Sequence, residues 1–141
     1  MRRRFQGGVK TLNIIEKIRD ILQNFPEISE ICNAVHVDFT DPEPTSYGLS
    51  SVGDSLIKSD ILGNQTRQHN FFLYSTFSSI NDYERLENSS TLLELAQWLE
   101  NQTDDKITKI TAENGQLFAI PEGNELDGWQ YQLQIVVQYK L

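Results

Sequence analysis

The chain closes with GWQYQLQIVVQYKL, residues 128–141, and this stretch decides the fold. Its odd positions are all apolar: Trp129, Tyr131, Leu133, Ile135, Val137, Tyr139 and Leu141. The even positions from Gln130 to Lys140 are polar except for Val136. Because side chains alternate between the faces of a strand, this period of two predicts one long β-strand. Such a strand is expected inside a sheet that is covered on its apolar face only.

Two amphipathic helices are expected to cover that apolar face. Residues 9–25 carry apolar side chains at helical spacing: Ile14, Ile15, Ile18, Ile21, Leu22 and Phe25. Thr11 or Asn13 is expected to cap this helix, and Pro26 ends it. A second helix is predicted over 86–102, with Asn81 or Asp82 near its start. The polar run 89–91 is expected to divide it into a short turn and a main helix.

The remaining segments read as strands and turns. A short strand is expected within 28–39 and another at 47–49, followed by a loop over 50–53. Residues 54–77 predict a β-hairpin that turns at Gly63-Asn64, with a polar end projecting beyond the sheet. Asn114-Gly115 predicts a further hairpin, and 121–127 a loop. The fold class is therefore α+β: a mixed or antiparallel sheet, two helices packed on one face, and a protruding β-hairpin.

The length of 141 residues corresponds to one domain, which we assign to 9–141. Residues 1–8, MRRRFQGG, differ in composition and are expected to be a flexible leader or a non-native start. The net charge of −8 argues against binding to phosphate backbones, and no apolar run approaches the length of a membrane span. Cys32 is the only cysteine, so no intrachain disulfide can form, and a reducing compartment is indicated.

No catalytic, cofactor or metal site is expected. His36 and His69 are the only histidines, and His69 is predicted to be exposed beside Arg67. Cys32 and His36 would stand about 13 Å apart on one strand, too far for a nucleophile–base pair. The acidic cluster 38–43 lacks the periodicity of a calcium loop and is expected to be a solvated turn. The absence of every catalytic signature argues against an enzyme.

Several short sequence motifs follow one another in a recognisable order. They are TSYGL (45–49), the turn Gly63-Asn64, TRQHNFFL (66–73), LENS (86–89), LAQWLENQ (95–102) and YQLQ (131–134). This order resembles the tail terminator (tail completion) proteins of long-tailed bacteriophages, especially Gram-positive prophage versions often labelled minor capsid proteins. The predicted helix at 12–25 fits the family's opening helix. The likeness covers 9–141; Asp104-Asp105, 121–127 and the leader depart from it.

The resemblance implies a ring, usually of six subunits, that caps the finished tail tube and stops its growth. The ring also presents the surface on which the head docks. Its expected partners are further copies of itself, the tail tube protein and a head-completion or connector protein. It implies no cofactor, no membrane and no specific nucleic-acid binding, with DNA passing through the ring. The expected location is the head–tail junction of the virion, after assembly in the bacterial cytoplasm.

The candidate subunit or partner interface is drawn from the hairpin and the last strand: Ile57, Ile61, Leu62, Arg67, His69, Gln130, Gln132 and Gln134. The hairpin aliphatics either fill the domain's own core or form an exposed interface patch. Two other functions stay open. One is a small α+β ligand-binding protein or enzyme around Arg67 and His69, which a pocket holding His69 against a buried carboxylate would favour. The other is a generic adaptor that joins a partner by its sheet edge.

Overall fold

The computed structural model describes residues 13–26, 28, 35–37, 46–77, 81–119 and 129–141. Four sequence-based predictions therefore lie outside the described residues: the leader 1–8, the Cys32–His36 relationship, the acidic turn 38–43 and the loop 121–127. The start of the first predicted helix, residues 9–12, lies outside them as well.

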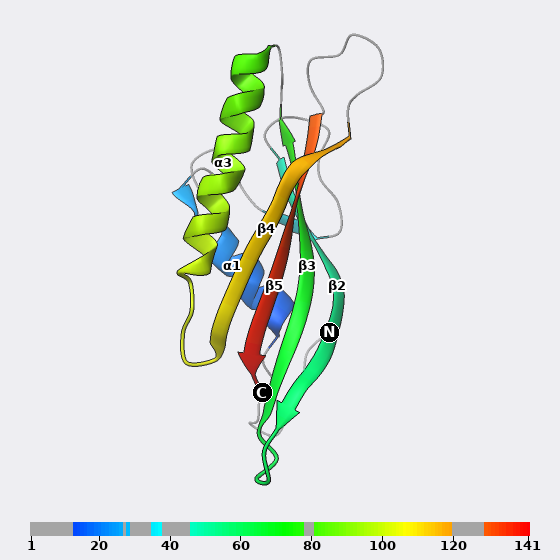
Figure 1. Ribbon diagram of the computed structural model, residues 1–141, viewed down its shortest axis with the longest axis vertical. Helices are drawn as coiled ribbons and strands as arrows, with labels where there is room; N and C mark the ends of the chain where they lie inside the picture. Colours follow the sequence, from blue (N-terminus) through cyan, green and yellow to red (C-terminus); the bar gives the residue numbers. More distant parts are fainter. Residues whose placement is uncertain (1–12, 27, 29–34, 38–45, 78–80, 120–128) are drawn as a thin grey trace.

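The described part of the chain forms an α+β fold, as predicted. Its elements are α1 (Ile14–Leu22), β1 (Val35–Val37), β2 (Ser46–Ser59), β3 (Gln65–Phe77), α3 (Asp82–Glu100), β4 (Ile107–Ala119) and β5 (Trp129–Lys140). The strands make one open sheet in the order β1-β2-β3-β5-β4 (Figure 1). β1 runs parallel to β2, and every other neighbouring pair is antiparallel. The sheet is therefore mixed, with a single short parallel strand.

β5 occupies the interior position that its alternation predicted. It pairs with β3 along its whole length, from Thr66 opposite Lys140 to Phe77 opposite Trp129, and with β4 on its other side. Its odd-numbered side chains from Tyr131 to Tyr139 are all buried, whereas the even-numbered ones from Gln130 to Gln138 are half-buried. The period-two pattern thus identified both the strand and its core-facing side.

Both helices contribute to the one core behind the odd-numbered face of β5. Asn13 caps α1 by accepting from the Glu16 N–H, and Asn81 caps α3 by accepting from the Glu84 N–H. Phe25, three residues beyond α1, packs against Trp98 in the last turn of α3, with ring centroids 5.3 Å apart. The two predicted helices and the caps Asn13 and Asn81 are confirmed, but α3 begins four residues before its predicted start at 86. The prediction that Pro26 ends the first helix is wrong: α1 ends at Leu22, and Pro26 lies in helical conformation after the turn at 23–24, because proline is tolerated in the first turn of a helix.

Three further local predictions are wrong. Residues 50–53 are strand, because β2 continues through them and a bulge between Ser51 and Gly53 absorbs the irregular sequence. Asn114-Gly115 makes no turn, because β4 runs on from Ile107 to Ala119 with an irregularity between Glu113 and Gln116. Residues 89–91 do not interrupt α3, which runs unbroken from Asp82 to Glu100; the Thr91 hydroxyl donates to the Glu87 carbonyl within the helix.

The β2–β3 hairpin is confirmed at its predicted turn. Gly63 adopts φ of 90°, a conformation that favours glycine. The Asp60 carboxylate accepts from the backbone N–H groups of Leu62 and Asn64 and from the Asn64 side chain. The polar half of β3 is not beyond the sheet, however, because it pairs with β5. Only the turn extends past the end of β5, at the bottom of Figure 1.

Candidate functional site

The hairpin turn carries aliphatic side chains that are exposed to solvent. Ile61 and Leu62 are 101% and 83% exposed, and Ile57, on the strand leading to them, is 46% exposed. Val52 and Leu56 of β2 are exposed too. The sequence left open whether these residues fill the core; they do not. Since the turn is held by the Asp60 hydrogen bonds, this apolar tip belongs to an ordered element.

β2 also has a free side within the described part of the chain. β1 pairs only with residues 47–49 of β2, so residues 50–59 have no described strand beside them on that edge. An unpaired edge presents backbone N–H and C=O groups to another strand. Edge and apolar tip lie on the same hairpin.

Arg67 and His69 lie on the core-facing side of β3 and join a polar network centred on Asp54. The Asp54 carboxylate accepts from Arg67 Nε at 2.5 Å, from His69 Nδ1 at 2.7 Å and from the Tyr139 hydroxyl at 2.6 Å. On the other side of the ring, His69 Nε2 lies 2.6 Å from the Ser51 hydroxyl. The predicted exposure of His69 is wrong: its exposed fraction is 6%. The hairpin register explains this, because β3 sets Asp54 directly opposite His69.

Proton positions in this network follow from its chemistry. An ionised carboxylate only accepts, so His69 Nδ1 donates to Asp54; in the neutral ring, Nε2 then accepts from Ser51. Burial alone would raise the pKa of Asp54, but hydrogen bonds from Tyr139, Arg67 and His69 together lower it below its usual 3.8. Burial and the Asp54 carboxylate raise the pKa of Tyr139 to about 12. Asp54 is thus held ionised and Tyr139 neutral.

The arrangement Ser51–His69–Asp54 has the connectivity of an acyl-transfer triad: hydroxyl, imidazole, carboxylate. The sequence search missed it because the three residues match no known motif. The signal that could have found it is the hairpin prediction itself, since pairing across Gly63-Asn64 brings 51–54 beside 69. A triad also needs a substrate cleft, and none of the three residues lines the pocket that opens beside the hairpin turn.

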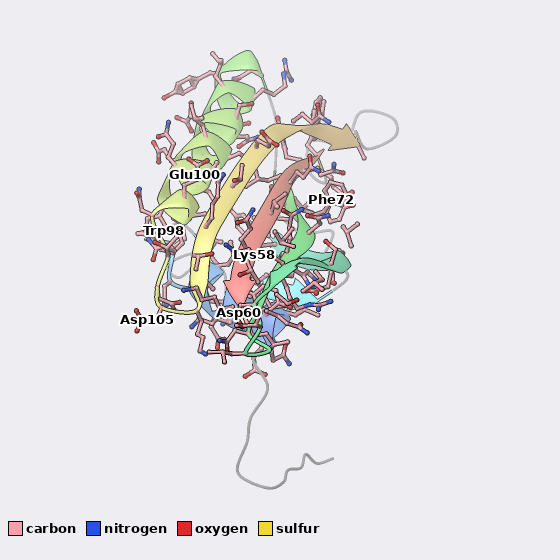
Figure 2. The ribbon with its side chains drawn as sticks, turned by 60° about the horizontal axis from the view of Figure 1, so that its bottom comes forward. Lys58, Asp60, Phe72, Trp98, Glu100 and Asp105 are labelled. Carbon is pink, nitrogen blue, oxygen red and sulfur yellow. The ribbon has the colours of Figure 1, made fainter. Side chains whose placement is uncertain are left out.

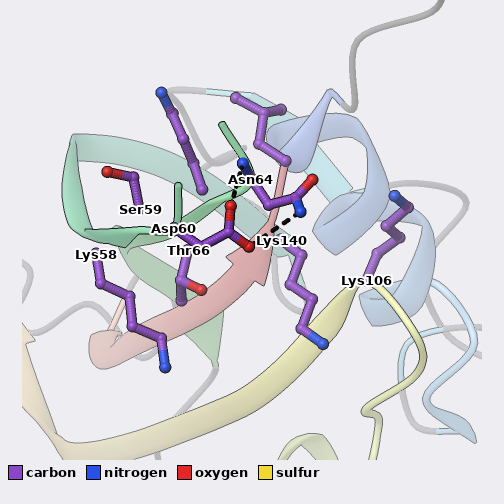
Figure 3. Close-up of a pocket in the computed structure, with 9 residues that line it drawn as sticks. Lys58, Ser59, Asp60, Asn64, Thr66, Lys106 and Lys140 are labelled. Atoms are coloured by element: carbon purple, nitrogen blue, oxygen red, sulfur yellow. Dashed lines mark hydrogen bonds between the residues drawn. The ribbon is translucent and has the colours of Figure 1, made fainter. Parts of the chain in front are cut away.

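A pocket of about 430 Å³ opens beside the hairpin turn (Figure 3). It is lined by Lys58, Ser59, Asp60, Asn64, Gln65, Thr66, Lys106, Lys140 and Leu141. Three strands that are remote in sequence bring its lysines together: Thr66 pairs with Lys140, whose backbone N–H donates to the Lys106 carbonyl. The three lysines outnumber the one acidic side chain of the lining, Asp60, and give this pocket a positive rim. Sequence reasoning did not detect it.

The glutamine row forms a separate surface. Gln130, Gln132 and Gln134 lie on the sheet face opposite the helices and are half-buried rather than open. Gln132 and Gln134 pair with Tyr74 and Phe72 of β3, so aromatic rings share this face. Figure 2 shows Phe72 on the side of the molecule away from α3. The predicted interface residues thus fall into three places: the hairpin tip, the polar network around Asp54, and the sheet face opposite the helices.

The outer side of α3 is a fourth candidate surface, which the sequence analysis did not single out. Tyr83, Leu86 and Leu93 follow one another at helical spacing and are all exposed, while Leu92, Leu95 and Leu99 fill the core. Glu87 flanks the outer residues and holds the Tyr83 hydroxyl, which raises the pKa of Tyr83. The helix is therefore apolar on two sides, and only one is covered within the described chain.

Across the described ranges, no group of three or more histidine, cysteine or acidic residues is placed to hold a metal ion. In the same ranges no helix combines the length and apolarity needed to cross a membrane. No protein-family model matches the sequence, and no curated protein matches it either.

Proposed function

We propose that this protein is a structural component of a phage or prophage tail. In this role it caps the tail tube as a ring, ends tube polymerisation and provides the head-joining surface. The observation that carries the proposal is the ordered hairpin with Ile61 and Leu62 almost fully in water. Each such side chain gains roughly 1.5–3 kcal/mol on burial, so a cluster of them at a protruding tip favours a subunit contact.

Two further features, the open edge of β2 and the net charge, fit the same role. The open edge of β2 offers a second means of joining a neighbour, and strand addition is a common way to join subunits. The net charge of −8 fits a ring through which DNA passes without sticking. The proposed partners are further copies of the chain, the tail tube protein and a head-completion or connector protein. The proposed location is the head–tail junction of the virion.

Assembly on tail tubes tests this function. Purified protein is mixed with tubes polymerised from the tail tube protein and examined by negative-stain electron microscopy. We expect a ring at one tube end and tubes that stop lengthening. Tubes that keep growing, with no added density at either end, would reject the proposal. A protein that is monomeric alone but forms rings on tubes still supports it.

A second candidate function is favoured by one specific observation, the hydrogen-bonded series Ser51–His69–Asp54. In a hydrolase, His69 would take the proton of Ser51 as the hydroxyl attacks an ester carbonyl, with Asp54 orienting the ring. Asp54 is already shared with Arg67 and Tyr139, which also fits a purely structural network. A fluorophosphonate probe separates the two: covalent labelling lost in Ser51→Ala supports a hydrolase, and no labelling leaves the network structural.

A further inference from the structure

Two exposed apolar surfaces lie on different parts of this molecule, and their charges are opposite. The first, here the hairpin end, comprises Ile61, Leu62 and the pocket lysines Lys58, Lys106 and Lys140. The second, here the α3 stripe, comprises Tyr83, Leu86 and Leu93 with the acids beside them. In Figure 1 the hairpin turn lies at the bottom, and α3 begins at the top.

The hairpin end is positive because three lysines outnumber the acidic side chain among them. Asp60 lines the pocket and is held ionised, since three hydrogen bonds from Asn64 and Leu62 lower its pKa, so its charge offsets that of only one lysine. Asp104, near Lys106 in sequence, is paired with Lys17 at 2.7 Å. Lys58, Lys106 and Lys140 surround the pocket in Figure 3, and no ion pair to them is found within the described residues.

The α3 stripe is correspondingly negative. The helix contains five acids, Asp82, Glu84, Glu87, Glu94 and Glu100, and one base, Arg85. Arg85 lies over the Trp129 ring, 5.3 Å from its centroid, and so is directed toward the sheet. Glu87 and Glu94 flank the exposed Tyr83, Leu86 and Leu93 by helical spacing. Glu100 and Trp98 of α3 lie apart from Lys58 and Asp60 in Figure 2.

We infer that the hairpin end of one copy docks on the α3 stripe of the next copy. Ile61 and Leu62 would cover Leu86 and Leu93, while the pocket lysines would face Glu87 and Glu94. The charge complementarity of the two surfaces argues for a second copy as the occupant, because an acidic helix and a basic tip occur on one chain. A contact between two different patches of the same protein is heterologous, and its repetition closes a ring when the rotation permits.

This inference rests on the proposed ring and names the surfaces that build it. Its test uses two full-length variants. Ile61→Asp with Leu62→Asp disables the hairpin end, and Leu86→Asp with Leu93→Asp disables the α3 stripe. All four positions are exposed, so circular dichroism should show that both variants remain folded. If the helix variant fails to fold, Glu87→Lys with Glu94→Lys replaces it.

Mixing the two variants gives a distinctive result. Each variant alone should lose self-association by at least about tenfold, because a charge would enter an apolar contact. In the mixture, the intact hairpin end of one and the intact α3 stripe of the other still fit. We therefore expect a one-to-one heterodimer, and nothing larger, by native mass spectrometry at concentrations where the unaltered chain forms rings.

A mixture that stays monomeric while the unaltered protein forms rings would overturn the inference and leave the proposed function standing. Retention of rings by either variant alone would overturn it as well. If the unaltered protein forms no ring alone, the two variants are mixed on tail tubes and scored for pairs at the tube end. Absence of any ring on tubes would reject both the proposed function and this contact.

Discussion

Asp54 links three neighbouring strands through its carboxylate. It joins β2 to β3 through Arg67 and His69 and to β5 through Tyr139. Its side chain is only 24% exposed, so the carboxylate replaces lost water contacts with these three donors. This explains how β3 can place Arg67 and His69 on its core-facing side with hydrogen-bond partners for both.

Replacing Asp54 with Asn should lower the free energy of unfolding at pH 7 by about 1–3 kcal/mol, because charge-assisted hydrogen bonds are lost. The folded pKa of Asp54 lies below 3.8, so its stabilisation is present above that value. It is lost as the pH falls through the folded pKa. Urea unfolding between pH 7 and pH 2 should therefore show a smaller acid loss in Asp54→Asn than in the unaltered protein. Equal acid losses would contradict this role.

Tyr139 should make stability depend on pH in the opposite sense, at alkaline pH. Its folded pKa of about 12 lies above the usual 10.0, so the folded state retains a proton that the unfolded chain releases. Stability should decline as the pH rises from 10 through 12. Tyr139→Phe removes this contribution and costs about 1 kcal/mol at pH 7 through the lost hydrogen bond to Asp54. Tyr83→Phe, at an exposed position, is the matched control and should leave stability at pH 7 nearly unchanged.

The sequence predicted little of the polar network around Asp54. His69 was expected in water because its neighbours in sequence are polar, yet its partners come from residues 51, 54 and 139. Pairing between distant strands decides whether such a side chain is buried, and the residues next to it in sequence do not show that pairing. For the aliphatic residues at the hairpin tip, the sequence left core and surface open, and the structure places Ile61 and Leu62 on the surface; their role as an interface stays a prediction.

Among the elements, the hairpin depends on its turn. A Cβ at Gly63 meets no atom within 4 Å, but φ of 90° disfavours any side chain there, so Gly63→Ala should cost about 1 kcal/mol. Hydrogen exchange should accelerate at the hairpin end and stay unchanged in β4. Gly53→Ala is the control: it has the same open space without a positive φ, and should be near neutral. Equal effects of the two substitutions would refute the turn argument.

The sequence predicted elements best where a pattern ran for many residues. β5, both helices and the turn of the hairpin followed from periodicity and capping residues. It failed at 50–53, at 89–91 and at Asn114-Gly115, where small polar residues are usually found in turns. In the two strands, pairing with a long neighbour continues the element: β3 pairs with β2, and β5 pairs with β4. In α3, the helix continues through 89–91 without a break.

For the whole molecule, the exposed hairpin predicts that folding and assembly can be separated. Ile61→Asp should leave the unfolding free energy within about 0.5 kcal/mol, because the side chain is fully exposed, and should abolish rings on tail tubes. Leu117→Asp, an exposed apolar position on β4 outside both proposed patches, is the control and should still assemble. Loss of folding in Ile61→Asp would return this residue to the core of the domain.

We propose that this α+β domain works by closing a ring on a tail tube. Electron microscopy of tubes incubated with the unaltered protein or with Ile61→Asp tests this function. We expect a ring of density at one end of each tube with the unaltered protein, and bare tubes with the variant. Bare tubes with the unaltered protein, or rings with both, would contradict it.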